Sequence, residues 1–263
     1  CSAMSMSRLG ETFDIHAGGE DLVFPHHEDE IAQSEGATGK PFVRYWLHAR
    51  HLMMDTEKMS KSLGNVVGLQ DVLDRGYAPA VVRYLLISAH YRKELSFSWD
   101  ALDDARAAVR RLSDFQHRLA TTPPSDQAAP SDFPAIAGRA LAAFEAALDD
   151  DLNTPAALGA LFTFVRETNA ALDRAGTVPK SELAAARDAL ASIDDVLGVL
   201  SLAAHTAPPA DDELATWVEE RLAARQQARK DRDFARADAI RDEIAAAGII
   251  VEDTPQGPRW KVE

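Results

Sequence analysis

Apolar residues recur at the three- and four-residue spacing of amphipathic helices over most of this chain, and this pattern constrains its fold most strongly. Proline-rich segments at 121–134 and 203–212 interrupt the pattern and predict loops or linkers. We therefore expect a mainly α-helical bundle at 96–202 and a separate module at 203–263. Helices are predicted over residues 80–90, 101–119, 135–150, 154–175, 180–200, 213–230 and 233–247.

The first 95 residues carry a mixed pattern instead. A strand-like segment at 13–16 precedes a predicted helix over 26–34, with Pro25 at its first position, where the missing N–H costs nothing. Two later glycines are expected to end this helix, and residues 42–54 are rich in the aromatic and aliphatic side chains of strands. Strand, helix, strand is typical of α/β folds, so residues 1–95 are predicted to form an α/β unit.

The C-terminal module is predicted to add a β-hairpin to its two helices. Gly248 ends the second helix, and the next three residues, 249–251, are apolar and β-branched. A turn at 255–257 would let residues 259–262 pair back on them. The module is therefore expected to have a small α+β fold.

Composition narrows the class of protein. The chain has 263 residues, is 46% hydrophobic and carries no long uncharged apolar run or signal-peptide pattern, so we expect no membrane span and no leader. Its single cysteine, Cys1, excludes an intrachain disulfide and fits a reducing compartment. A net charge of −14 argues against indiscriminate binding of polyanions, although a local basic face remains compatible with it.

The strongest motif is Lys58-Met59-Ser60-Lys61-Ser62, which we call the lysine motif. Two ammonium groups beside small hydroxyl residues can neutralise the charge that develops when pyrophosphate leaves a triphosphate. A generic lysine pair at this spacing is more often a solvated loop. The complete motif, placed after an α/β segment, favours phosphate chemistry.

A second group of residues has the chemistry of a zinc site. His26 and Glu30 lie four residues apart and would share one face of a helix, whereas His27 and Glu28 would point elsewhere. An imidazole and a carboxylate, together with the thiolate of Cys1, suit zinc. By itself, a histidine and glutamate at this spacing is more often an ordinary surface pair.

Two further regions are candidates for ligand contact. His16 and Asp21 flank a glycine-rich segment after the first strand, where a ligand could approach the backbone closely; a simple tight turn is the alternative. Residues 221–241 hold seven basic and three acidic side chains, a net +4, on predicted helices. A solvated helix pair explains such a charge run equally well.

Three stretches together resemble the cysteinyl-tRNA synthetases, which are class I aminoacyl-tRNA synthetases. They are CSAM at 1–4, DIHAGGEDL at 14–22 and FPHHEDEIAQS at 24–34, with the lysine motif as a fourth match. The resemblance implies a Rossmann-like catalytic remnant at 1–95 that lacks the first part of the catalytic domain. It also implies that the tail is an anticodon-binding module.

The resemblance assigns roles to individual residues. Lys61 and Lys58 would contact ATP and support the transition state, with Ser60, Ser62, His16 and Asp21 also near the nucleotide. Cys1, His26 and Glu30 would hold zinc, with a further cysteine from the missing upstream part. Arg229, Phe234, Asp238 and Asp253 would contact the anticodon loop, and Arg83 and Arg92 either touch the tRNA or form structural salt bridges. The family usually has glycine where Ala17 stands, and tryptophan can occupy the place of Phe234.

The function implied is ATP-dependent ligation of L-cysteine to tRNA(Cys) through a cysteinyl-adenylate, with magnesium accompanying ATP. Zinc would select cysteine over serine because it binds a thiolate far better than a neutral hydroxyl. We expect a cytoplasmic monomer, and we expect this chain alone not to form the adenylate. One alternative is a cysteine ligase of low-molecular-weight thiol biosynthesis, against which the tail argues. The other is a non-catalytic RNA-binding paralogue, against which the intact lysine motif argues.

Overall fold

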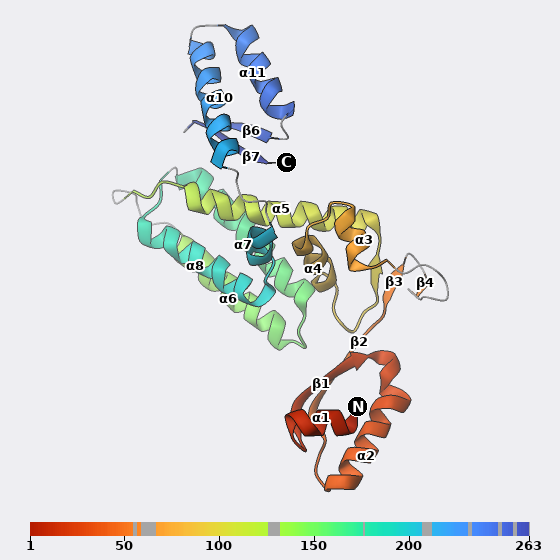
Figure 1. Cartoon of the computed structure of the whole chain (residues 1–263). Coiled ribbons are helices and arrows are strands. Elements are labelled where there is room, and N and C mark those ends of the chain that lie inside the picture. The colour runs from red at the N-terminus through yellow and green to blue at the C-terminus, as the bar shows by residue number, and fades with distance from the viewer. Residues whose placement is uncertain are drawn as a thin grey trace. The chain divides into compact units, whose positions relative to one another are not determined.

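The computed structural model of the chain describes residues 1–54, 57–58, 67–125, 132–175, 177–206, 212–230, 233–246, 249–254 and 257–262. These residues form two compact units, Cys1–Thr206 and Ala207–Glu263 (Figure 1). Most of the described residues are helical, and the strands are short. No helix in the described part of the chain is long and apolar enough to cross a membrane.

The first unit begins with the predicted strand–helix–strand arrangement. Helix α1 (Ser2–Leu9) is followed by β1 (Phe13–Gly19), helix α2 (Glu28–Thr38) and β2 (Val43–Ala49). Strands β1 and β2 pair in parallel, from Phe13 opposite Val43 to Gly19 opposite Ala49. Because parallel strands need a crossover, α2 connects the end of β1 to the start of β2. The predicted order of strand, helix and strand is confirmed, but β1 extends through Gly19, so Ala17–Gly19 belong to the strand rather than to a turn after it.

The entry into α2 differs from the prediction. The helix begins at Glu28 rather than at His26, after a 3-10 turn (Glu20–Leu22) and an irregular helical turn (Val23–His27). Phe24 has an extended backbone inside that turn (φ −136°, ψ 132°), because a residue that precedes proline is kept out of the helical region. Gly36 lies within the helix, and only Gly39, at φ +68°, supplies the left-handed residue that ends it.

A second small sheet follows. Strand β3 (Leu52–Met54) lies between β4 (Glu57–Lys58), which is antiparallel to it, and β5 (Leu95–Phe97), which is parallel. The segment 42–54 therefore holds two strands, β2 and β3, rather than one. Two short helices, α3 (Leu69–Asp74) and α4 (Pro79–Ile87), separate β4 from β5 in the sequence.

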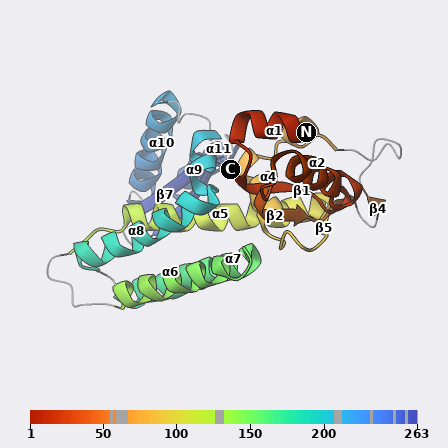
Figure 2. The same ribbon diagram turned by 90° about the horizontal axis from the view of Figure 1, so that it is seen from below.

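The helical bundle completes the first unit. Its helices are α5 (Trp99–Thr121), α6 (Phe133–Asp149), α7 (Thr154–Ala175), α8 (Lys180–Leu197) and α9 (Leu200–Thr206). Helices α6 and α7 pack side by side (Figure 2). Buried aromatic and aliphatic side chains from all five helices, including Phe115, Phe133 and Phe164, form one continuous core. The mainly helical character of this region agrees with the periodicity of its apolar residues, and its core continues into α3, α4 and β5.

The predicted helix 180–200 is in fact two helices. Gly198 takes φ +63° between α8 and α9, and the Asp194 side chain accepts hydrogen bonds from the backbone N–H groups of Val199, Leu200 and Ser201. The carboxylate therefore caps α9, which extends to Thr206 and occupies the first four residues of the predicted linker at 203–212.

The second unit has the predicted elements. Helices α10 (Asp212–Lys230) and α11 (Phe234–Ala246) precede β6 (Ile249–Thr254) and β7 (Gly257–Val262). The two strands form an antiparallel hairpin, with Ile249 opposite Val262. Val218 and Leu222 of α10 pack with Ile240 and Ile244 of α11 and with Ile249, which gives this unit a hydrophobic core of its own.

Candidate metal and substrate site

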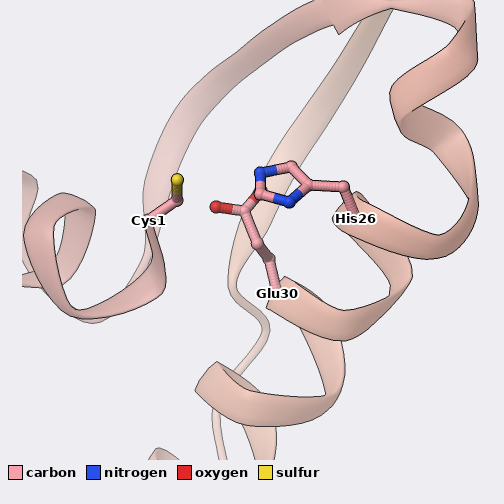
Figure 3. Close-up of side chains that lie close together, drawn as sticks. All are labelled: Cys1, His26 and Glu30. Carbon is pink, nitrogen blue, oxygen red and sulfur yellow. The ribbon is translucent and has the colours of Figure 1, made fainter.

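The candidate site is centred on Glu30, a carboxylate that is only 2% exposed in the first turn of α2. Cys1 approaches it from the residue before α1, and His26 approaches from the irregular turn before α2 (Figure 3). One ligand atom from each of Cys1, His26 and Glu30 lies within 4.8 Å of the other two. These are the three residues that we proposed from the sequence as zinc ligands. They lie close together in the structure although 24 residues lie between Cys1 and His26 in the sequence.

His16 and His27 also face the same carboxylate. His16 Nε2 lies 2.8 Å from Glu30 Oε2, and His27 Nε2 lies 3.9 Å from the same oxygen. The prediction that His27 points away from Glu30 is therefore wrong. A residue three positions before Glu30 can share its face as well as one four positions before it, and the break at Phe24 removes His26 and His27 from regular helical geometry.

The donor set fits a zinc ion. Glu30 Oε1 is buried and has no hydrogen-bond partner among the residues that the structure describes. Burying a carboxylate oxygen away from water without a hydrogen-bond partner costs free energy, and a cation beside the oxygen would offset that cost. Sulfur, imidazole nitrogen and carboxylate oxygen are all zinc ligands, so Cys1, His26 and Glu30 together match this metal chemically.

Imidazole and indole rings form the wall behind Glu30. His27 Nδ1 lies 2.7 Å from His48 Nε2, and the rings of His16 and His27 each lie 4.9 Å from that of Trp46. Burial lowers the pKa of His27, and the neighbouring His16 and His48 imidazoles lower it further. The lowered pKa favours the neutral form of the His27 imidazole, whereas the nearby Glu30 carboxylate opposes the shift.

The segment Ala17–Asp21, which we call the glycine turn, comprises the last three residues of β1 and the first two of the 3-10 turn, and it packs against these rings. A Cβ atom at Gly18 would lie 2.8 Å from His27 Cε1, and one at Gly19 would lie 2.5 Å from Asp21 Oδ1. The space at Gly18 therefore favours glycine, because the His27 ring is buried, whereas the atom nearest to Gly19 is the end of the exposed Asp21 side chain. The side chain of Ala17 is exposed, which explains how its extra methyl group is accommodated. Asp21 is 54% exposed, and its Oδ1 lies 3.9 Å from His51 Nε2.

The lysine motif lies largely outside the described residues. The backbone of Lys58 ends β4, paired opposite Met53. Ser60, Lys61 and Ser62 lie outside the part of the chain that the structure describes.

The predicted tRNA contacts fall in two places. Arg229, Phe234 and Asp238 are exposed on α10 and α11, with Phe234 63% exposed despite its apolar ring. Asp253 belongs to β6, opposite Pro258.

The two arginines of the first unit have protein partners. The Arg83 guanidinium donates to the carbonyl oxygen of Leu197 at the end of α8. Arg92 forms an ion pair with Asp151 at the α6–α7 turn. Both contacts favour the structural role over the RNA-binding one.

Sequence reasoning missed His48 and Arg50, both of which border the site. His48 lies opposite Gly18 in the β1–β2 pairing, and Arg50 directly follows β2. Neither belongs to a motif: the register of the parallel pair places His48 beside the glycine turn, and the contact of Arg50 with Glu20 places Arg50 there.

We compared the chain with protein families and with solved structures. Residues 1–107 match the class I (C) tRNA synthetase catalytic domain, residues 143–201 the DALR domain, and residues 211–260 the cysteinyl-tRNA ligase anticodon binding domain. The chain is similar in fold to a LeuRS of Agrobacterium radiobacter K84, solved in a ternary complex with tRNA and LeuAMS. That similarity has a TM-score of 0.52 at 20% identity and covers 76% of this chain and 30% of the LeuRS chain. The chain therefore belongs to the class I aminoacyl-tRNA synthetases.

Curated relatives narrow the class to one family. The chain is 48% identical to the cysteine--tRNA ligases of Symbiobacterium thermophilum and Solibacter usitatus, over 99% of its own length. It belongs to the cysteine--tRNA ligase family. It spans 55% of the length of either relative, so it corresponds to about half of such an enzyme.

Proposed function

We propose that the full-length protein joins L-cysteine to tRNA(Cys) at the expense of ATP, through a cysteinyl-adenylate. The observation that carries this proposal is the convergence of Cys1, His26 and Glu30 within 4.8 Å, in a chain whose relatives are cysteine--tRNA ligases. These three side chains supply a thiolate, an imidazole and a buried carboxylate, which are zinc ligands. A zinc site suits an enzyme that recognises a sulfur-containing substrate.

Cys1, His26 and Glu30 would hold the zinc ion, with a further ligand from outside this chain. When bound, zinc would supply a Lewis acid that prefers the thiolate of cysteine to the hydroxyl of serine. Shape alone separates these two amino acids poorly, because they differ by one atom. The chain's own contribution is to keep Glu30 oriented, through His16, and to exclude water with the wall of His27, His48 and Trp46.

Nucleotide binding would fall to the glycine turn and the lysine motif. Asp21 is exposed, and its Oδ1 atom occupies the space that a side chain at Gly19 would fill. His16, whose Nε2 contacts Glu30, would lie between the metal and the nucleotide. Lys58 and Lys61, with Ser60 and Ser62, would neutralise the charge that builds on the departing pyrophosphate, together with magnesium.

The three-part division of labour is also a proposal. Residues 1–95 would be the Rossmann-like second half of a catalytic domain, 96–202 a helical bundle that contacts the tRNA, and 203–263 a module that reads the anticodon. Arg229, Phe234, Asp238 and Asp253 would contact the anticodon loop. An exposed aromatic ring can stack on an unpaired base, and an aspartate can accept hydrogen bonds from a guanine edge.

Two alternatives are less well supported. A cysteine ligase that acts on an amino sugar has no use for the anticodon binding domain that residues 211–260 match. A non-catalytic RNA-binding paralogue has no use for the clustered metal donors. We propose further that the enzyme is a cytoplasmic monomer and that this chain by itself does not form the adenylate.

Cysteine-dependent exchange between ATP and pyrophosphate, measured on the full-length protein, tests the proposal. Exchange with cysteine and none with serine is expected, followed by charging of tRNA(Cys). Exchange without tRNA charging would favour the small-molecule ligase. A folded, zinc-loaded protein without any exchange would favour the RNA-binding paralogue.

A further inference from the structure

We propose that Arg50 is a positioning residue for ATP, which ties the glycine turn to the strand pair that ends at Lys58. The inference rests on the function proposed above and adds a residue that no motif contains. Arg50 lies between β2 and β3, at the point where the chain leaves one sheet for the other.

The Arg50 side chain holds the glycine turn by two contacts with one carboxylate. Its Nε lies 3.0 Å from Glu20 Oε2, and its Nη1 donates to Glu20 Oε1 at 3.4 Å. Two-point contacts between a guanidinium and a carboxylate fix orientation as well as distance. Since Glu20 directly precedes Asp21, Arg50 holds the segment that carries the candidate nucleotide-binding carboxylate.

The next residue, His51, faces Asp21 in the way that Arg50 faces Glu20. His51 Nε2 lies 3.9 Å from Asp21 Oδ1, and that oxygen fills the space beside Gly19 where a side chain would otherwise stand. Arg50 and His51 therefore face Glu20 and Asp21 in the same order, so that the two-point contact of Arg50 holds the residue directly before Asp21.

The backbone of Arg50 is anchored on its other side. Its N–H donates to the carbonyl oxygen of Tyr91 at 2.8 Å. Strand β3 begins two residues later at Leu52, and its partner β4 ends at Lys58, the first residue of the lysine motif. Arg50 thus joins the glycine turn and the start of the lysine motif through eight residues of chain, most of them in paired strands.

Direct contact between Arg50 and phosphate is disfavoured. In addition to the Glu20 carboxylate, which faces Nε and Nη1, the Arg50 guanidinium has Glu94 Oε1 at 3.9 Å from Nη1. Two carboxylates face a single guanidinium, so a phosphate group there would meet net repulsion. Arg50 therefore acts through Glu20 rather than on ATP itself.

The experiment measures exchange kinetics of the full-length protein with ATP as the varied substrate. Arg50→Ala is expected to raise the KM for ATP about fivefold, with kcat within about twofold and zinc content unchanged, since misplacement of a binding group weakens binding. Glu20→Gln should raise the KM for ATP by a similar factor. The variant that combines Arg50→Ala with Glu20→Gln should have a KM for ATP no higher than that of either single variant. Arg50→Lys keeps the charge without the two-point contact and should fall between Ala and wild type.

Arg44→Ala is the matched control. Arg44 lies in β2 and pairs with Asp14 of β1 at 3.2 Å, on the same small sheet but away from the glycine turn. Equal KM values for ATP in Arg50→Ala and Arg44→Ala would overturn the inference. If Arg50→Ala does not fold, Arg50→Lys and Glu20→Gln test the inference instead. Wild-type KM values for ATP in both variants would overturn the inference. A wild-type protein without cysteine-dependent exchange would instead overturn the proposed function, which separates the two failures.

Discussion

His16 Nε2 and Glu30 Oε2 lie 2.8 Å apart, although 14 positions separate the two residues in the sequence. The contact joins β1 to the first turn of α2 and engages one oxygen of a carboxylate whose other oxygen, Oε1, is buried without a partner among the described residues. A residue assigned to the nucleotide from its motif thus also orients a candidate metal ligand. Such supporting contacts fix which oxygen a carboxylate presents.

Removing a proposed ligand should remove the metal. Glu30→Ala and His26→Ala are each expected to lose most of the bound zinc, because three donors from this chain become two. Zinc per protein, measured by elemental analysis after dialysis, checks this prediction. Glu28→Ala is the matched control, since Glu28 is an exposed carboxylate at the start of the same helix. Full zinc occupancy in Glu30→Ala would remove Glu30 from the ligand set.

His16→Ala should weaken zinc binding without abolishing it. Loss of a hydrogen bond that orients a ligand typically costs about tenfold to a hundredfold in metal affinity. Competition with a chelator, followed for His16→Ala and wild type, measures the change. Wild-type affinity in the variant would mean that the contact with Glu30 does not support the metal and would leave His16 with the nucleotide alone.

Lys61→Ala should slow adenylate formation without affecting zinc binding. Loss of an ammonium group that neutralises transition-state charge should slow adenylate formation in the full-length protein by about a hundredfold or more, while zinc stays bound. Single-turnover formation of the adenylate, with zinc content measured on the same sample, tests both halves. An unchanged rate would exclude Lys61 from the mechanism.

The Asp151 carboxylate should stabilise the first unit in a pH-dependent way. Hydrogen bonds from Arg92 and Tyr91 lower its pKa from 3.8 to about 2. A lowered carboxyl pKa means that the stabilisation is present above pH 3.8 and disappears as pH falls towards 2. Asp151→Asn should therefore lower the melting temperature at neutral pH, and the difference from wild type should shrink through this window.

Asparagine is the informative substitution at position 151. The residue has φ +54°, a left-handed conformation that asparagine also tolerates, so the variant removes the charge without adding backbone strain. A difference in melting temperature that stays constant across the acid range would show that the carboxylate charge is not the cause.

Phe234 should contribute to RNA binding by stacking. Its ring is 63% exposed at the start of α11. Phe234→Ala is expected to weaken binding of the anticodon stem–loop about tenfold, within the range of about 1–3 kcal/mol per stacked base, whereas Phe234→Trp should retain it. Ala245→Ser, an uncharged and exposed change on the same helix, controls for a general effect of surface mutation. Equal affinities for Phe234→Ala and wild type would exclude stacking at this position.

Local pattern alone determined the order and type of most elements. The helical spacing of apolar residues located the bundle, and the residues of the C-terminal hairpin followed from its turn. Boundaries were less accurate where two local signals competed. Gly36 is tolerated inside α2, whereas the left-handed backbone of Gly198 splits a continuous periodic stretch into α8 and α9.

The sequence by itself determined the chemistry of the site: a thiol, an imidazole and a carboxylate of the kind that zinc binds, and a lysine motif suited to phosphate. Only the tertiary structure decided which side chains share the Glu30 carboxylate and which hold the glycine turn. The parallel pairing of β1 with β2 places His48 beside Gly18, and the exit from β2 brings Arg50 to Glu20. Contacts between residues 30 or more positions apart depend on strand register and chain path, which no local spacing encodes.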